Sequence, residues 1–277
     1  MTKKIAALAA LAIVLLTQRP HAQTGARIFF VDVGTGAGTL IVSPAGKTLL
    51  VDGGPPTAGT NRILPLLTTL GIAKIDYTIV THYHIDHMGG MIEVLNSGKV
   101  SGGIAYDNGD GADVQPPGAS TGSTSTRGTY LNYIAATAAG GAARQTAVPG
   151  TVLDLGGGMT ATIVAAGGKF LSGGSVPFTT GDLNSESISV LVEYNTFDYL
   201  VSGDLTGGGS TSTAKTPDIE TYVGQMVGDV DVVQLDHHGS TTGSNQAFLS
   251  ALKAEVSMSG VFAVEVLPPP VRSPETR

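Results

Sequence analysis

His82-Tyr83-His84-Ile85-Asp86-His87 places four metal-ligating side chains within six residues. Imidazole nitrogens and carboxylate oxygens are donors that zinc, manganese and iron take from proteins, and a run this compact can supply two neighbouring ions. A surface cluster of histidines, or a set of core histidines, is the alternative interpretation. Neither accounts for the interleaved aspartate or for the Gly89-Gly90 pair that follows. The stretch therefore predicts a metal site.

The residues that flank this run predict where it lies in the fold. Asp76 to Thr81 is a short apolar stretch typical of a strand, and Met88 to Leu95 has the composition of a helix start. We therefore expect the ligands on a strand-to-helix loop. Loops at strand ends are where α/β folds build their sites.

Composition indicates one globular domain. The chain has 277 residues, of which 42% are hydrophobic, enough to bury a large core. It contains no cysteine, which excludes disulfides, thiolate ligands and a cysteine nucleophile. Any metal must then be held by nitrogen and oxygen ligands alone.

The N-terminus has the layout of a secretory signal peptide. Lys3 and Lys4 precede an apolar run from Ile5 to Leu16, which is too short for a bilayer that needs about twenty residues. We predict cleavage after a signal peptide of residues 1–22, a periplasmic or secreted mature chain, and no stable membrane insertion after cleavage; a retained anchor is the alternative. Removing three positive charges takes the formal charge from -7 to -10, which disfavours tight binding of long polyanions.

Strands are predicted before the His run. Ile28 to Val33, Thr39 to Val42 and Thr48 to Asp52 read as three strands of a hairpin-rich sheet. Asp52 comes at the end of the third strand, where its carboxylate can accept a hydrogen bond from a metal-bound imidazole. Asn61 to Leu70 predicts a helix broken or kinked near Pro65.

The middle of the chain is rich in small polar residues. Asp107 to Arg127 predicts a long surface loop, and Tyr130 to Ala139 a helix. Gly118 to Gly122 satisfies a GxSxG pattern, but no strand leads in and no helix leads out, so a serine nucleophile is disfavoured.

The second half again delivers polar residues at strand ends. Ser187 to Glu193 and Phe197 to Val201 predict a hairpin that runs into Asp204. Val230 to Leu235 predicts a strand that runs into His237 and His238. A metal site between two sheets requires ligands from separate parts of the sequence, and these strand ends supply them.

Six segments together resemble a known family. They are Phe30-Val31-Asp32-Val33-Gly34, Leu50-Val51-Asp52-Gly53-Gly54, the His82 to His87 run, Asn184-Ser185-Glu186-Ser187, Ser202-Gly203-Asp204-Leu205 and Asp236-His237-His238-Gly239-Ser240. The pattern is similar to the metallo-β-lactamase-fold hydrolases, and specifically to the metal-dependent domain of competence-type DNA-uptake proteins. The resemblance implies a single-domain α/β fold, a four-layer αββα sandwich over residues 23–262. The composition of residues 263–277 predicts a Pro-rich tail, which departs from the family.

The resemblance also implies roles for individual residues. His82 and His84 would bind one metal, Asp86 and His87 the second, Asp204 would bridge the two, and His237 would complete the second. Asp52 would support the ligands. No histidine occurs between His87 and His237, so Asn184 stands in for the histidine that this superfamily usually supplies there. The catalytic roles fall to Asp86, which would orient the water, and to His238, which would act as general acid or hold a substrate oxygen.

The predicted function is hydrolysis by a water bound to two divalent ions, zinc or manganese. The resemblance favours a phosphodiester substrate, either a small molecule or nucleic acid. A lactamase or lactonase with the same centre is the first alternative. A decayed metal-binding or interaction protein is the second, and the absent histidine, Ala37 in place of an acid, and the unusual C-terminal tail favour it.

Overall fold

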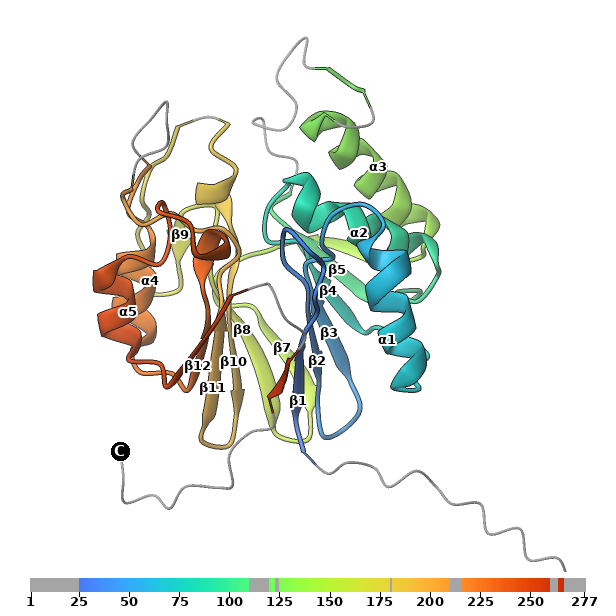
Figure 1. Ribbon diagram of the computed structural model, residues 1–277, viewed down its shortest axis with the longest axis horizontal. Helices are drawn as coiled ribbons and strands as arrows, with labels where there is room; N and C mark the ends of the chain where they lie inside the picture. The colour runs from blue at the N-terminus through green and yellow to red at the C-terminus, as the bar shows by residue number, and fades with distance from the viewer. Residues whose placement is uncertain are drawn as a thin grey trace, which may run out of the picture.

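Two β-sheets face each other and carry helices on their outer faces (Figure 1). The computed structural model describes residues 25–109, 120–122, 125–179, 181–209 and 216–259, together with the strand at 264–266. The predicted signal peptide and residues 267–277 of the predicted tail lie outside this part of the chain. No helix in the described ranges has the length and apolarity needed to span a bilayer.

The first sheet has the strand order β14-β1-β2-β3-β4-β5-β6. Its strands are β1 (Arg27–Phe30), β2 (Thr39–Val42), β3 (Thr48–Val51), β4 (Tyr77–Ile79), β5 (Ile104–Asp107), β6 (Ala143–Thr146) and β14 (Val264–Val266). The strands from β14 to β3 pair antiparallel, and those from β3 to β6 pair parallel. Because β14 pairs with β1, the sheet extends into the segment that composition assigned to the tail.

The second sheet has the order β13-β12-β11-β10-β8-β7, with β9 paired to β8. Its strands are β7 (Val152–Gly156), β8 (Met159–Ala166), β9 (Lys169–Phe170), β10 (Ser189–Tyr194), β11 (Phe197–Val201), β12 (Val232–Gln234) and β13 (Val256–Met258). The predicted hairpin across Asn195 is present, and β7 and β8 form a second antiparallel pair. Strands β11, β12 and β13 are parallel.

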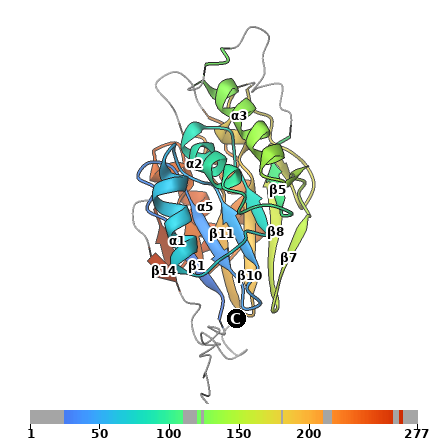
Figure 2. The same cartoon turned by 90° about the vertical axis from the view of Figure 1, so that its right-hand side faces the viewer.

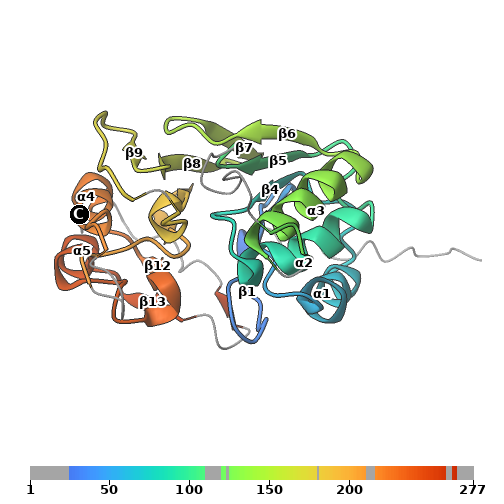
Figure 3. The ribbon, with the colours of Figure 1, turned by 90° about the horizontal axis from the view of Figure 1, so that it is seen from above.

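The helices lie in two outer layers (Figures 1 and 2). They are α1 (Leu64–Thr69), α2 (Ile85–Asn96), α3 (Thr126–Ala139), α4 (Glu220–Val227) and α5 (Gln246–Leu252), with short helical turns at Gly59–Ile63, Asn184–Glu186 and Asp236–Gly239. The first three cover the first sheet, and α4 and α5 cover the second. Figure 3 shows the resulting α-β-β-α order from above. The predicted four-layer sandwich is confirmed.

Two local predictions differ from the structure. Helix α2 begins at Ile85, three residues before the predicted start, so Asp86 and His87 lie on its first turn rather than on a loop. Of the predicted loop from Asp107 to Arg127, Asp107 ends β5 and Thr126 begins α3, while residues 110–119, 123 and 124 lie outside the described part.

Three apolar clusters hold the layers together. The central one fills the space between the sheets, where Phe30 of the first sheet meets Tyr199 of the second edge to face, with ring centroids 5.5 Å apart. The other two join each sheet to its helices. Burial on both faces explains why β2 and β3 read as continuous apolar runs rather than as alternating ones.

The topology brings the predicted ligands to one edge. Asp52 follows β3 and His82 follows β4, and because these strands are parallel their carboxyl ends lie together. Asp204 follows β11 and His237 follows β12, which are parallel in the second sheet. The candidate site therefore lies at the edge where the carboxyl ends of both sheets meet.

Candidate metal centre

Six side chains form two groups of three donors at this edge. The first group is His82, His84 and Asp204, and the second is Asp86, His87 and His238; within each group the donor atoms lie within 4.8 Å of one another. The first sheet and α2 supply four of these residues, and the loops after β11 and β12 supply Asp204 and His238. The centre thus joins the two halves of the sandwich.

Asp204 lies between the two groups. Its Oδ1 is 3.2 Å from His87 Nε2, and its Oδ2 is 3.3 Å from His238 Nε2 and 3.8 Å from His82 Nε2. Its side chain is 4% exposed, so water offers the carboxylate little compensation for burial. The position is the one that the sequence analysis gave to a bridging carboxylate.

Buried polar atoms at the centre lack hydrogen bonds. His87 Nε2, Asp204 Oδ1 and Asn184 Oδ1 are buried and make no hydrogen bond to the described residues. His82 Nε2 and His84 Nδ1 lie 3.0 Å apart. Two nitrogens that share one zinc at about 2.0–2.1 Å each lie roughly 3–3.5 Å apart. The donor set and its unsatisfied atoms fit divalent ions.

Neighbouring hydrogen bonds set which nitrogens face the centre. Thr81 Oγ1 donates to Asp52 Oδ2 and so can only accept from His82 Nδ1, 3.2 Å away. His87 Nδ1 lies 2.7 Å from Asp52 Oδ2. In the neutral rings, both Nδ1 atoms then carry the proton and both Nε2 lone pairs are left for a metal. Asp52 thus takes the supporting position that the sequence analysis gave it.

The two buried histidines titrate in opposite directions. Burial, together with the charge of His87, lowers the pKa of His82 well below its ordinary value. Burial opposes protonation of His87 too, but Asp204 and Asp52 outweigh it and raise the pKa of His87 well above the ordinary value. His87 in turn holds the pKa of Asp204 well below its usual range despite burial. The metal-free centre therefore holds a proton on His87 between two carboxylates.

A second ion pair lies at the more open side of the centre. Burial disfavours charge on His238, but hydrogen bonds from its ring to Asp204 and Asp86 raise its pKa to about 9. Burial likewise opposes ionisation of Asp86, and the bond from His238 lowers its pKa to about 2. These shifts mean that protons compete with a metal for His87 and His238.

His237 and His238 occupy positions other than those expected. His238 lies with Asp86 and His87, where we expected His237, whereas His237 Nε2 is 3.9 Å from Asp204 Oδ2 and 3.2 Å from Asn184 Nδ2. Both histidines have positive φ, 49° and 55°, which turns adjacent side chains to different sides of the centre. Asn184 also lies close to His84, which places it beside the first group.

Sequence reasoning did not single out three supporting residues. Ser187 Oγ accepts from Asp204 N at 3.1 Å and lies 3.4 Å from His82 Nδ1, so one hydroxyl links both sheets. Thr242 Oγ1 contacts His237 Nδ1, and Thr81 links His82 to Asp52. Ser187 and Thr81 adjoin predicted strand ends, which is the feature that could have identified them. Thr242 carries no comparable pattern.

Comparison with known proteins places this geometry in context. Residues 31–113, which include the His run, match the family model described as the metallo-beta-lactamase superfamily. No curated protein sequence matches the chain. Similar solved structures include zinc-bound PqqB from Methylobacterium extorquens (11% identity, TM-score 0.45, 76% of this chain and 72% of that one). A diphosphatase of the PhnP family is also similar (15% identity, TM-score 0.47, 87% of this chain and 98% of that one). So is the metallo-beta-lactamase fold protein YhfI from Bacillus subtilis (12% identity, TM-score 0.45, 86% of this chain and 99% of that one).

The family segment covers β2 to β5 and the start of the site, and the sheet order and helix layers extend the same architecture over the described chain. These observations establish the layer order and the position of the donor groups at the sheet edge. Residues 31–113 are thus similar to the metallo-beta-lactamase superfamily, and the described chain has the four-layer α-β-β-α fold.

Proposed function

We propose that this chain is a metal-dependent hydrolase that uses two divalent ions, zinc or manganese, to hydrolyse phosphodiesters. The observation that carries the proposal is the pair of donor groups with Asp204 between them. Bound divalent ions would lower the pKa of a coordinated water towards neutrality and offset negative charge on the reacting ester. The proposal extends to an exported chain, as the N-terminal sequence suggests.

The residues divide into clear roles under this proposal. His82, His84 and Asp204 would hold one ion, and Asp86, His87 and His238 the other. Asn184, whose buried Oδ1 has no hydrogen-bond partner among the described residues, would add an oxygen donor to the first ion. His237 lies near Asp204 but outside the two groups, and its Nε2 lies 3.2 Å from Asn184 Nδ2, so it would help to orient Asn184.

A phosphodiester suits the charge at the centre. Two ions carry four positive charges against the two carboxylates of Asp86 and Asp204, so the loaded centre favours an anionic substrate. The chain as a whole is acidic, with a formal charge of -7, which disfavours a long polyanion that would extend over its surface. We therefore favour a small phosphodiester over a long nucleic acid.

The test compares metal content with hydrolysis in the purified mature chain. Metal per chain is measured, followed by hydrolysis of bis(p-nitrophenyl) phosphate, single-stranded DNA and nitrocefin, with and without chelator. We expect chelator-sensitive hydrolysis of the small diester in preference to the other two substrates. Preferential nitrocefin hydrolysis would support the lactamase alternative, and no hydrolysis by a loaded, folded protein would support a decayed centre.

Ligand variants tie the activity to the site. We expect His84→Ala and Asp204→Ala each to lower diester hydrolysis by more than about a hundredfold, because each removes a donor to a metal. Asp154→Ala is the matched control, since Asp154 is an exposed acid on β7 with a side chain 78% exposed. Full turnover by a metal-loaded His84→Ala protein would contradict the assignment.

A further inference from the structure

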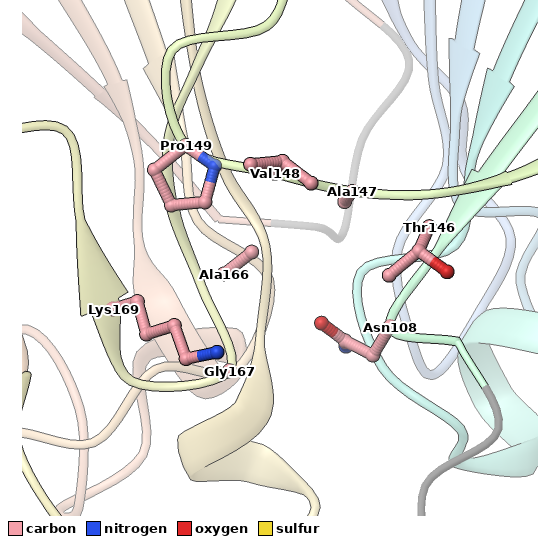
Figure 4. Close-up of a pocket in the computed structure, with 8 residues that line it drawn as sticks. All are labelled: Asn108, Thr146, Ala147, Val148, Pro149, Ala166, Gly167 and Lys169. Atoms are coloured by element: carbon pink, nitrogen blue, oxygen red, sulfur yellow. The ribbon is translucent and has the colours of Figure 1, made fainter.

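A pocket of about 180 Å³ lies at the same sheet edge as the metal centre. Its walls come from the ends of β5, β6 and β8 and from the first residue of β9, as Figure 4 shows. It is lined by Asn108, Thr146, Ala147, Val148, Pro149, Ala166, Gly167 and Lys169. The volume is below the roughly 300–1,000 Å³ of a site for a whole drug-sized ligand, so it suits one arm of a larger substrate.

Residues that line the pocket are hydrogen-bonded to segments that carry the metal centre. Asn108 Nδ2 donates to the carbonyl of Thr81 at 2.9 Å, and Thr81 directly precedes His82. On the opposite wall, Gly167 N donates to the carbonyl of Glu186, in the helical turn that begins at Asn184. Both walls are thus held by residues that adjoin the first donor group.

Lys169 supplies a positive charge to this pocket. Its ammonium points across the pocket towards Asn108 (Figure 4). In the described part of the chain, no carboxylate pairs with Lys169, and no acidic residue lines the pocket. The Gly167-Gly168 turn, with φ of 55° and 68°, joins β8 to β9 tightly and fixes where Lys169 leaves the sheet.

The remaining walls are mostly apolar. Ala147, Pro149 and Ala166 line the pocket, and Val148 is 57% exposed. A ligand with an apolar segment would cover this surface while its charged end reached Lys169. An unpaired cation beside an apolar wall therefore suits an amphipathic anion.

We propose that this pocket binds an arm of the substrate that carries an oxyanion, a carboxylate or a phosphate, beyond a short apolar spacer. This inference rests on the proposed hydrolase function, because it assigns the arm that is remote from the bond cleaved at the metal centre. The substrate class is then a small ester of phosphate with a second anionic group. Lys169 binds that group, and Asn108, fixed by its bond to Thr81, borders the path to the metals.

Three matched substrates test the pocket in the metal-loaded protein. They are 4-nitrophenyl phenyl phosphate, its 4-carboxyphenyl counterpart and the counterpart with a phosphate monoester in place of the carboxylate. We expect Lys169→Gln to raise KM about tenfold for the charged substrate that the pocket accepts, with kcat unchanged and the neutral substrate unaffected. Comparison of the two charged substrates distinguishes carboxylate from phosphate.

Lys253→Gln is the control, because it removes an equal charge from an exposed lysine at the end of α5. An equal KM rise for all three substrates in Lys169→Gln, or the same change in Lys253→Gln, would overturn the proposal. Either result would mean that Lys169 acts through the net charge of the protein and not through a contact with the substrate.

A binding measurement separates this proposal from the hydrolase function. Benzoate and phenyl phosphate are titrated into the metal-free protein, and NMR follows the Asn108 side-chain amide and the Gly167 backbone amide. We expect one of the two probes to shift both signals in the wild type and neither signal in Lys169→Gln. Shifts without any hydrolysis by the loaded protein would leave the pocket assigned and refute the hydrolase function. No shift with either probe would refute the pocket even if hydrolysis is observed.

Discussion

Asp52 controls the centre although none of its atoms belongs to either donor group. Its carboxylate accepts from Thr81 N and Thr81 Oγ1, both at 2.8 Å, and from His87 Nδ1 at 2.7 Å. Its φ of 57° is a left-handed conformation that Asn also tolerates. Asp52→Asn therefore changes the charge and the hydrogen bonds with little change in the backbone.

We expect Asp52→Asn to lower metal affinity about 10- to 100-fold. The new amide can donate to His87 Nδ1, which moves the ring proton to Nε2 and blocks the lone pair that faces Asp204. Calorimetric titration of the metal-free protein measures the loss. Asp32→Asn is the control, since the Asp32 carboxylate accepts from Gly34 N in a local turn and belongs to neither donor group. Unchanged isotherms for Asp52→Asn would show that Asp52 does not set the tautomer.

His238 makes metal binding depend on pH. Its pKa of about 9 in the metal-free protein means that it must release a proton to bind a metal at neutral pH. We expect the apparent metal affinity to rise between pH 6.5 and about 9. Release of this one proton accounts for an increase of up to about tenfold for each pH unit. Titrations in buffers of different ionisation enthalpy count the protons, and His238→Gln should release one fewer. Release of the same number of protons by the wild type and His238→Gln would contradict this role of His238.

The same shift affects the stability of the metal-free protein with a defined sign. The folded pKa of His238 is raised above the ordinary value of 6.5, so its favourable contribution is fully present below about pH 6.5. It is lost as pH rises through about 9. Urea unfolding of the metal-free protein at pH 6.5 and pH 9 should show a smaller decrease in stability for His238→Gln than for the wild type. An equal decrease in stability in the two proteins would show that His238 does not cause the pH dependence.

Helix α2 carries Asp86 and His87, and glycines fix its distance from the sheet. A Cβ at Gly90 would lie 2.0 Å from the carbonyl oxygen of Gly53, and one at Gly53 would lie 2.1 Å from Met91 N. The helix therefore packs on the β3 end through backbone contacts. This explains why the Gly89-Gly90 pair follows the His run so closely.

We expect Gly90→Ala to lower the free energy of unfolding by about 1–3 kcal/mol and to weaken metal binding, because α2 must move outward. Chemical denaturation and metal titration measure the two effects. Gly25→Ala is the control, since no atom lies within 4 Å of its added Cβ. If Gly90→Ala retains wild-type stability and affinity, then the close approach does not position the ligands.

At the scale of the whole molecule, the centre connects two sheets that otherwise meet through apolar contacts. His82, His84 and His87 come from the first half of the chain, and Asp204 and His238 from the second. A metal bound only by the folded protein stabilises it by about 2.7 kcal/mol at a hundred times Kd. Each kcal/mol raises Tm by roughly 2–4 °C in a chain of this size.

We therefore expect saturating zinc to raise Tm by roughly 5–10 °C. Thermal unfolding followed by circular dichroism measures this shift, with magnesium as the control ion because imidazole donors bind it poorly. Asp204→Ala should lose most of the shift because it removes the carboxylate that lies between the two groups. An equal shift in Asp204→Ala would place the stabilising ion elsewhere in the molecule.

Local patterns in the sequence determined the local elements and the metal chemistry. Apolar runs with turn residues at their ends predicted most strands, because burial and turn geometry act over a few residues. The run from His82 to His87 predicted a metal site for the same reason, since its ligands are neighbours in the chain. The short strands β5, β6, β9, β13 and β14 and the helices α4 and α5 were not predicted, because their periodicity is brief.

Only the tertiary structure decided which distant residues meet. His237 and His238 are equivalent as a sequence pattern, and the left-handed turn at both residues turns His238 towards Asp86 and His87. The pocket around Lys169 likewise requires β5, β6 and β8 to end beside one another. Such convergence depends on strand order and on backbone conformation at strand ends, which no short stretch of sequence specifies.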